Sequence, residues 1–189
     1  MKRAVKGNYG YLNAKRIQVL IKTIVFCVIP LLLFAAGYIT TGTRKNLLTV
    51  VAVLGCLPAC KSLVSLIMYV RSTGCSLTAK ETIEKQEGHL IGMYDMYFTS
   101  YKQNFPVSHM VVEGKNVCGY TEISSCDTKA CETHLETMLK QGGYKDLTIK
   151  IFTDLTKYVQ RLKQLNEMTH ERTPERDDEV RVVLYDISL

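Results

Sequence analysis

The first 80 residues of this 189-residue chain contain no aspartate or glutamate, although they contain eleven lysines and arginines. The remaining residues contain thirteen basic and eighteen acidic side chains, so the net charge of +6 hides two halves of opposite sign. A domain that binds nucleic acid needs basic side chains clustered on its folded surface. Because the polar half of this chain is mildly acidic, nucleic acid is not expected as a partner.

The sequence also lacks the short motifs of common enzyme chemistries. No glycine-rich phosphate loop of either common type is present, since Gly142-Gly143 is typical of a helix end. The four histidines have no serine or cysteine partner at a spacing that indicates a catalytic triad. The pattern predicts no catalytic residue and no cofactor, and it favours a protein that is not an enzyme while leaving that question open.

The cysteines predict neither a disulfide framework nor a metal site. Their number, seven, is odd, and most of the chain is expected to face the cytoplasm, where thiols stay reduced. Cys118, Cys126, Cys131 and His134 form the most compact thiol–imidazole group, but their spacing is not the paired C-x2–4-C pattern of zinc sites. We therefore expect buried or surface thiols here and no bound metal.

Two long apolar segments dominate the first half of the chain. Residues 23–43 contain no charged side chain, and residues 46–70 contain only Lys61. A helix that crosses a bilayer needs about 20 apolar residues. The sequence therefore predicts a first transmembrane helix, with the start of an outer link, over residues 17–43 and a second over residues 44–71, joined as a tight hairpin.

The basic residues predict the orientation of this hairpin. Six of them lie between residues 2 and 22, whereas the short link contains Arg44 and Lys45. The positive-inside rule places both termini in the cytoplasm of a multi-pass protein of the cell membrane. Residues 1–16 are expected to form a basic cytoplasmic segment that either contacts the anionic inner leaflet or stays solvated. A cleaved signal peptide is the main alternative, because small residues at 35–37 follow the apolar run.

Three residues inside the apolar segments are candidates for function. Pro30 and Pro58 lie near the middle of the two helices and are expected to bend both at about one depth. Lys61 is an ionisable residue within a span, which is a functional hypothesis by default, although its side chain is long enough to reach the headgroups. Ser62 and Ser65 favour a helix–helix seam, either within the hairpin or in a homo-oligomer formed through it.

Residues 72–189 have the pattern of a cytoplasmic α+β domain with a mixed sheet. Helical and strand periodicities alternate in the order α-β-β-β-α-β-α-β. The pattern predicts a helix over residues 79–86, strands over 90–98, 107–112 and 117–123, a helix over 128–141, a strand over 147–152, a helix after Asp154, and a last strand over 180–187.

The order of helix, three-strand meander, helix and strand resembles the core of the restriction-endonuclease-like fold. Enzymes of that fold carry a metal-binding aspartate on the second strand and a Glu-x-Lys motif on the third. In this chain the second-strand residue nearest to the position of that aspartate is His109. The third strand offers Glu122-Ile123-Ser124, which has no lysine. Glu113-Gly114-Lys115 has the letters of the motif but is expected in a turn. The resemblance implies a degenerate or active hydrolase around His109, Glu113 and Glu122.

Three functions are consistent with the whole sequence. The leading hypothesis is a two-span membrane protein whose cytoplasmic domain binds a protein or a small-molecule ligand without catalysis, with the anionic inner leaflet as its lipid surroundings. The first alternative is an effector whose oligomerised hairpins perturb the bilayer under control of the domain, with Lys61 as the key residue. The second alternative is the hydrolase implied by the resemblance.

Overall fold

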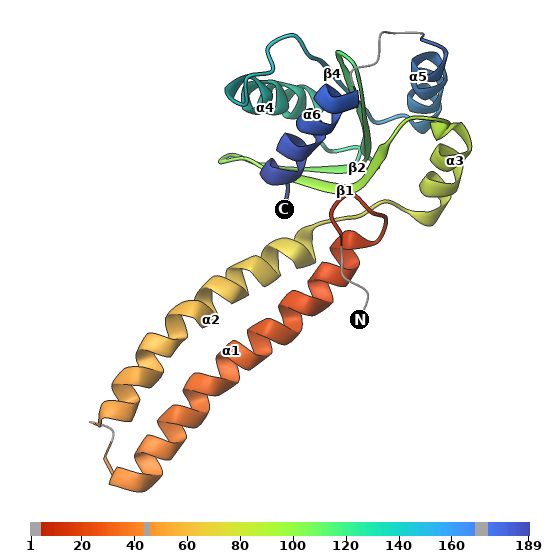
Figure 1. Cartoon of the computed structure of the whole chain (residues 1–189). Helices are drawn as coiled ribbons and strands as arrows, with labels where there is room; N and C mark the ends of the chain where they lie inside the picture. The colour runs from red at the N-terminus through yellow and green to blue at the C-terminus, as the bar shows by residue number, and fades with distance from the viewer. Residues whose placement is uncertain (1–4, 44–45, 169–173) are drawn as a thin grey trace. The chain divides into compact units, whose positions relative to one another are not determined.

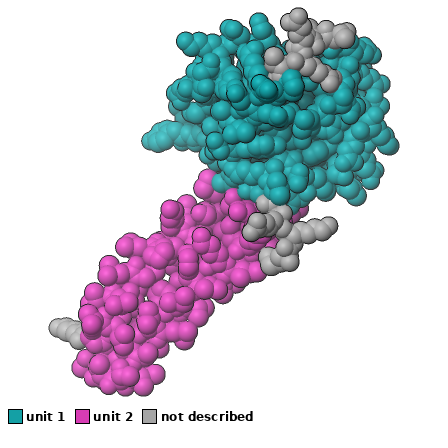
Figure 2. Space-filling view, in the orientation of Figure 1, with its two compact units in different colours: residues 1–12, 73–189 teal, residues 13–72 magenta. Residues whose placement is uncertain are grey.

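The computed structural model describes residues 5–43, 46–168 and 174–189. The chain forms two compact units, which Figure 2 distinguishes by colour. One unit consists of residues 13–72, and the other combines residues 1–12 with residues 73–189. Residues 5–12 therefore belong with the C-terminal domain, although the apolar hairpin separates them from it in the sequence.

The first unit is a hairpin of two long helices, α1 (Tyr11–Thr41) and α2 (Leu47–Arg71) (Figure 1). Asn46 caps α2, because its side chain accepts a hydrogen bond from the amide of Thr49. Both helices are long and apolar enough to cross a membrane, judged by length and composition. The predicted hairpin is confirmed, and the link residues Arg44 and Lys45 lie outside the described residues.

The two helices pack along a seam with a seven-residue period. Half of the eight seam residues are glycine, serine or threonine, which allow two backbones to approach closely. A seven-residue period is also the geometry of an antiparallel coiled coil. The residues that meet across this seam are Arg16 with Tyr69, Thr23 with Ser62, Pro30 with Gly55, and Gly37 with Leu48.

The second unit is built on a four-stranded mixed sheet in the order β1-β2-β3-β4. Its strands are β1 (Gly92–Thr99), β2 (Asn104–Glu113), β3 (Asn116–Tyr120) and β4 (Thr148–Phe152). The first three strands form an antiparallel meander, and β4 lies parallel to β3 after a helical crossover. The predicted strand order is thus confirmed through β4.

Helices cover both faces of this sheet (Figure 1). α3 (Leu77–Glu87) and α5 (Leu155–Glu167) pack on one face and share a core with Tyr94, Val111 and Tyr120. α4 (Thr128–Gln141) and α6 (Pro174–Ile187) pack on the other face around Phe98 and Met110. Side chains of Ser76, Asp127 and Asp154 cap three of these helices.

The predicted last strand over residues 180–187 is wrong, because these residues belong to helix α6. The β-branched run around Val182 favours a strand locally, but Val180 and Leu184, one helical turn apart, are its fully buried apolar residues. Pro174 begins the helix, and Glu175 and Asp177 lie in its first turn, where they complement the helix dipole. Packing of this helical face against the sheet outweighs the local strand preference.

Candidate functional site

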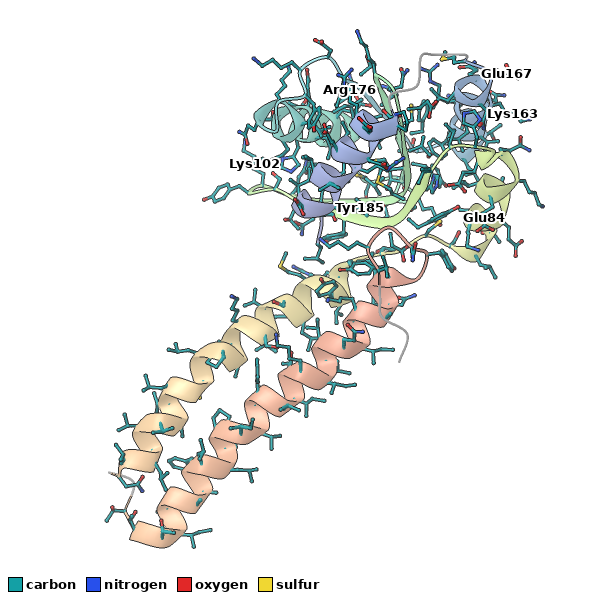
Figure 3. All side chains as sticks on the ribbon, in the orientation of Figure 1. Glu84, Lys102, Lys163, Glu167, Arg176 and Tyr185 are labelled. Atoms are coloured by element: carbon teal, nitrogen blue, oxygen red, sulfur yellow. The ribbon has the colours of Figure 1, made fainter. Side chains whose placement is uncertain are left out.

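A polar groove between α3 and α5 is the candidate site of the domain. Its volume is about 460 Å³. Its lining residues come from the C-terminal ends of the two helices and from the turn after α3: Lys85, Gln86, Gly88, His89, Lys163, Asn166 and Glu167. Figure 3 labels Lys163 and Glu167 on α5, with Glu84 on α3. Two lysines and one glutamate make the lining basic, which suits a ligand that presents carboxylates.

Asn166 holds the two walls of the groove together. Its amide nitrogen donates to the carbonyl oxygens of Gln86 and Glu87 at 2.8 and 3.1 Å, and its side-chain oxygen accepts from the amide of His89 at 3.2 Å. One α5 side chain thereby satisfies the backbone groups at the end of α3, which would otherwise lack partners. The groove is therefore built on a defined backbone geometry.

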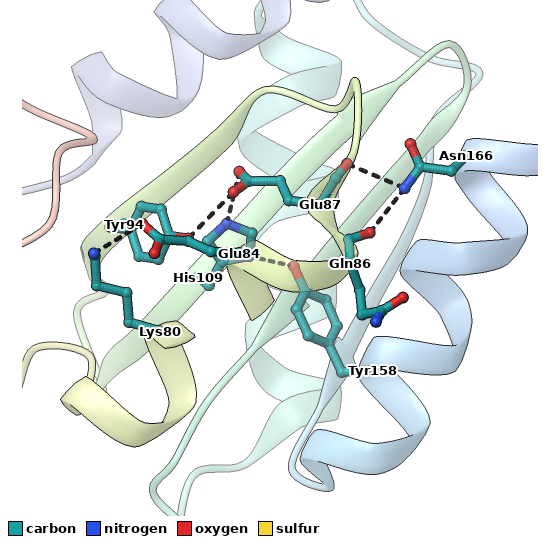
Figure 4. A network of polar contacts seen from close by, with 8 residues as sticks. All are labelled: Lys80, Glu84, Gln86, Glu87, Tyr94, His109, Tyr158 and Asn166. Carbon is teal, nitrogen blue, oxygen red and sulfur yellow. Dashed lines mark hydrogen bonds and ion pairs between the residues drawn. The ribbon is translucent and has the colours of Figure 1, made fainter. Parts of the chain in front are cut away.

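A buried polar network lies on the same face of the sheet (Figure 4). The side chain of His109 on β2 has no exposed surface. Its Nδ1 atom lies 2.7 Å from the hydroxyl of Tyr158 on α5, and its Nε2 atom lies 3.4 Å from a carboxylate oxygen of Glu87 on α3. The hydroxyl of Tyr94 donates to the same carboxylate at 3.3 Å. The network thus connects α3, α5 and two strands.

The pKa values of both His109 and Glu87 are lowered, but for different reasons. Burial lowers the pKa of His109 below its ordinary value, although Glu87 opposes this shift. Burial raises the pKa of Glu87, but the contacts with His109, Tyr94 and the Gly92 amide outweigh it, so the pKa of Glu87 is lowered overall. Near neutral pH the arrangement is a carboxylate beside a neutral imidazole.

Gly92 is the position that lets Glu87 and His109 meet. A Cβ atom at Gly92 would collide with both the Glu87 carboxylate and the His109 ring. Its backbone has no left-handed conformation, so the requirement for glycine at this position comes from space. The first residue of β1 therefore belongs to the construction of the network.

Asp95 organises a second buried polar cluster, where the chain leaves the domain and returns to it. Its carboxylate accepts a hydrogen bond from the amide of Cys75 at 2.8 Å, and it accepts further hydrogen bonds from the amides of Gly10, Tyr11 and Leu12. Asp95 is buried and has a φ of 57°, which is rare for a residue other than glycine. We call this group of five residues the Asp95 clamp.

The Asp95 clamp explains why residues 5–12 belong to the domain. Gly7 forms an antiparallel bridge with Tyr94 of β1. The Lys6 ammonium donates to the carbonyl oxygens of Tyr185 and Ser188 at 2.8 and 2.9 Å. Leu12 is fully buried. The sequence predicts a separate basic segment over residues 1–16, whereas residues 5–12 of that segment lie in the domain fold and α1 already begins at Tyr11.

The three residues of the hydrolase hypothesis do not converge on one site. His109 is sealed in the network, and Glu113 lies four residues along β2, about 13 Å away at the rise of a strand. Glu122 follows β3 at the opposite end of the hairpin, where it accepts a hydrogen bond from the amide of Ser76 at 2.7 Å. Lys115 is exposed in the turn.

The structure separates the three candidates within the apolar helices. Pro30 is buried in the seam against Gly55, whereas Pro58 is exposed and lines another pocket together with Lys61. All seven cysteines are free. Over the described ranges 5–43, 46–168 and 174–189, no group of three histidine, cysteine, aspartate or glutamate side chains is placed to bind a metal.

Sequence reasoning missed Glu87, Asp95, Asn166 and Tyr158. Asp95 offered a signal, because it is an isolated acid within the otherwise buried strand sequence Met93-Tyr94-Asp95-Met96. The other three are ordinary helix residues in sequence, and only their meeting in space distinguishes them. No protein-family model, curated protein or solved structure matches this chain.

Proposed function

We propose that this chain is a two-span protein of the cell membrane whose α+β domain binds a partner protein at the cytoplasmic face without catalysing a reaction. The observation that carries the membrane part is the uncovered apolar surface of the hairpin. Twenty-three large apolar side chains of α1 and α2 are exposed, among them Leu31, Ile39 and Leu57 at 67%, 80% and 69%.

Exposure of this size is costly in water. Transfer of one such side chain out of water is favourable by about 1.5–3 kcal/mol, so the whole set amounts to tens of kcal/mol. Only 11% of the most apolar stretch of α1 and 17% of that of α2 are buried, unlike the core helix of a water-soluble protein. Lipid hydrocarbon is the surroundings that this surface fits.

A binding role for the domain is supported by two features: the polar network around His109 is buried, whereas the groove between α3 and α5 is open to solvent. His109, whose imidazole lies 3.4 Å from the Glu87 carboxylate, is sealed from solvent and cannot touch a substrate. The groove is open, and Lys85 and Lys163 are exposed on its two walls. A protein segment that carries aspartate or glutamate side chains matches this charge.

The membrane part is tested by labelling one cysteine at a time. In a chain whose seven cysteines are replaced, Thr43→Cys marks the link and Ser125→Cys marks the domain, both at exposed positions. A maleimide that does not cross membranes should label Thr43→Cys in intact cells and Ser125→Cys only after permeabilisation. Labelling of both, or the reverse pattern, would contradict the proposed orientation.

The binding part is tested by photocrosslinking from the groove. Replacing Asn166 would remove the hydrogen bonds that join the groove walls, so the photoreactive amino acid is placed at the exposed Gln164 on α5 instead. The captured protein should carry an acidic segment, and Lys85→Glu with Lys163→Glu should abolish capture. Lys102→Glu, an exposed charge reversal away from the groove lining, is the control and should leave capture unchanged. Capture that survives the double reversal would refute binding at the groove.

A further inference from the structure

A second pocket lies between α1 and α2, wholly within the hairpin unit. Its volume is about 240 Å³, and it is lined by two lysines, three hydroxyl side chains and three apolar residues: Lys22, Lys61, Ser62, Ser65, Tyr69, Val19, Phe26 and Pro58. Both α1 and α2 contribute a lysine. The pocket therefore combines two positive charges with an apolar wall.

The seam places the two lysines at one level of the hairpin. The hydroxyls of Thr23 and Ser62 are 2.8 Å apart, and Thr23 also donates to the carbonyl oxygen of Ser62 at 3.2 Å. Lys22 and Lys61 each immediately precede one of these residues. The Lys22 ammonium lies 5.4 Å from the centre of the Phe26 ring, which keeps it beside the pocket.

No side chain of this unit supplies a counter-charge. Residues 1–80 contain no aspartate or glutamate, so none of the residues 13–72 is acidic. Two ammonium groups on one small pocket repel each other unless an anion lies between them. An anion bound in this pocket therefore has to come from outside the hairpin.

The position of the pocket along the helices indicates which anion is available. The charge-free part of α1 begins at Thr23 and continues to the end of the helix, about 28 Å at the rise of an α-helix. This length is close to the roughly 30 Å thickness of the hydrocarbon core of a bilayer. Lys22 and Lys61 then lie at one boundary of the hydrocarbon, which is the depth of lipid phosphate groups.

We propose that this pocket binds the phosphate group of an anionic phospholipid from the inner leaflet. The two ammonium groups contact the phosphate oxygens, and the apolar wall of Val19, Phe26 and Pro58 contacts the start of an acyl chain. The inference rests on the proposed membrane location. It assigns Lys61 to lipid recognition at the edge of the hydrocarbon, in place of a role at the bilayer centre.

Native mass spectrometry of the full chain in detergent tests the site, with phosphatidylglycerol as the probe and phosphatidylcholine as its zwitterionic comparison. The wild type should retain phosphatidylglycerol preferentially. Lys22→Gln with Lys61→Gln should weaken retention by roughly tenfold or more, because each lysine near an anionic lipid contributes about 1 kcal/mol. Lys22→Arg with Lys61→Arg keeps both charges and should restore retention.

Lys15→Gln with Arg71→Gln is the matched control, since it removes the same charge from α1 and α2 outside the pocket lining. Equal loss in this control, unchanged retention in the pocket variant, or equal retention of phosphatidylcholine would overturn the proposal. Displacement of the lipid by millimolar glycerol phosphate would overturn its lipid part, because a soluble phosphate would then suffice. Circular dichroism should show the same helix content in all variants. A variant that loses helix content is set aside, and the arginine pair is then compared with the wild type.

Alkaline carbonate extraction of cell membranes separates this proposal from the membrane location on which it rests. A chain that stays in the membrane pellet but retains no phosphatidylglycerol refutes only the lipid site. A chain released into the soluble fraction refutes the membrane location as well.

Discussion

Two buried polar residues, Asp95 and His109, depend on specific hydrogen-bond and charge partners in this structure. Asp95 holds an uncommon backbone conformation and receives amides from residues 10–12 and from Cys75. His109 occupies a sealed position between a carboxylate and a hydroxyl. Buried polar groups of this kind are costly when a partner is removed, so substitutions at these two residues are informative.

Asp95→Asn should destabilise the domain by about 2 kcal/mol, because an amide offers one acceptor oxygen where the carboxylate offers two. Asparagine tolerates the positive φ, so the change removes hydrogen bonds without adding backbone strain. Hydrogen exchange on the full chain should show faster exchange of the amides of residues 10–12 and 75. Asp146→Asn, at an exposed position, is the control. Unchanged protection in Asp95→Asn would contradict the clamp.

Gly74→Ala tests the same clamp from its other side. A Cβ atom at Gly74 would lie 2.7 Å from an oxygen of Asp95, so the carboxylate has to move away from its amides. We expect a loss of about 2 kcal/mol of unfolding free energy, as for other overpacked buried sites. Denaturant titration would measure it, and a loss below about 0.5 kcal/mol would show that the carboxylate moves freely.

The stability of the domain should fall as the pH falls below about 6.5. The pKa of His109 is lower in the folded protein than in the unfolded chain, so the unfolded state binds a proton first and gains stability. The slope from this one residue reaches at most about 1.4 kcal/mol per pH unit. Glu87, whose folded pKa is below its ordinary value, adds a further loss only below about pH 4.5.

Tyrosine fluorescence during denaturant unfolding can measure this slope, since the chain has eleven tyrosines and no tryptophan. His109→Gln should remove most of the slope between pH 6.5 and 5. His134→Gln is the control, because burial lowers the pKa of this histidine too, but its side chain is only half-buried and the substitution should leave most of the slope. A slope that His109→Gln leaves intact would assign the pH dependence to other groups.

At the scale of elements, the seven-residue seam decides how α1 and α2 pair. Gly55 faces the ring of Pro30, and a Cβ atom there would lie 3.2 Å from it. The surface that faces away from the seam is apolar and exposed, as at Val53. The seam and the outer surface of the hairpin differ in residue size more than in polarity. Small side chains are needed at the seam because the two backbones approach closely there.

Gly55→Leu should therefore separate the helices, whereas Val53→Leu should be neutral. A cysteine pair at Thr23 and Ser62, in a background without other cysteines, reports the pairing through disulfide formation, because these side chains touch in the wild type. We expect Gly55→Leu to slow crosslinking at least severalfold and Val53→Leu to leave its rate unchanged. Equal rates in both variants would contradict the seam.

At the scale of the whole molecule, the N-terminal residues complete a domain that the rest of the chain builds from residue 73 onward. Gly7 and Gly10 both have φ values near +80°, so a side chain at either position introduces similar backbone strain. A Cβ atom at Gly7 would also collide with the ring of Tyr185 on α6, whereas nothing lies within 4 Å of one at Gly10.

Gly7→Ala should therefore cost about 2 kcal/mol more unfolding free energy than Gly10→Ala, the excess being the loss of packing on α6. Denaturant titration of the two full-length variants measures the difference. Equal losses would show that backbone strain alone matters at Gly7 and that the N-terminal segment adds no stability to the domain.

The sequence by itself determined the elements whose cause is local. The charge-free runs, the hairpin, the capping residues Ser76, Asp127 and Asp154, and the meander with its glycine turn all follow from periodicity and from side chains that act on neighbouring backbone. Tertiary structure decided the rest. Residues 180–187 form a helix because one helical face packs on the sheet, against the local preference of their β-branched run. The groove, the His109 network, the Asp95 clamp and the lysine pocket each join residues distant in the chain, and their chemistry exists only where folding brings those side chains within contact distance.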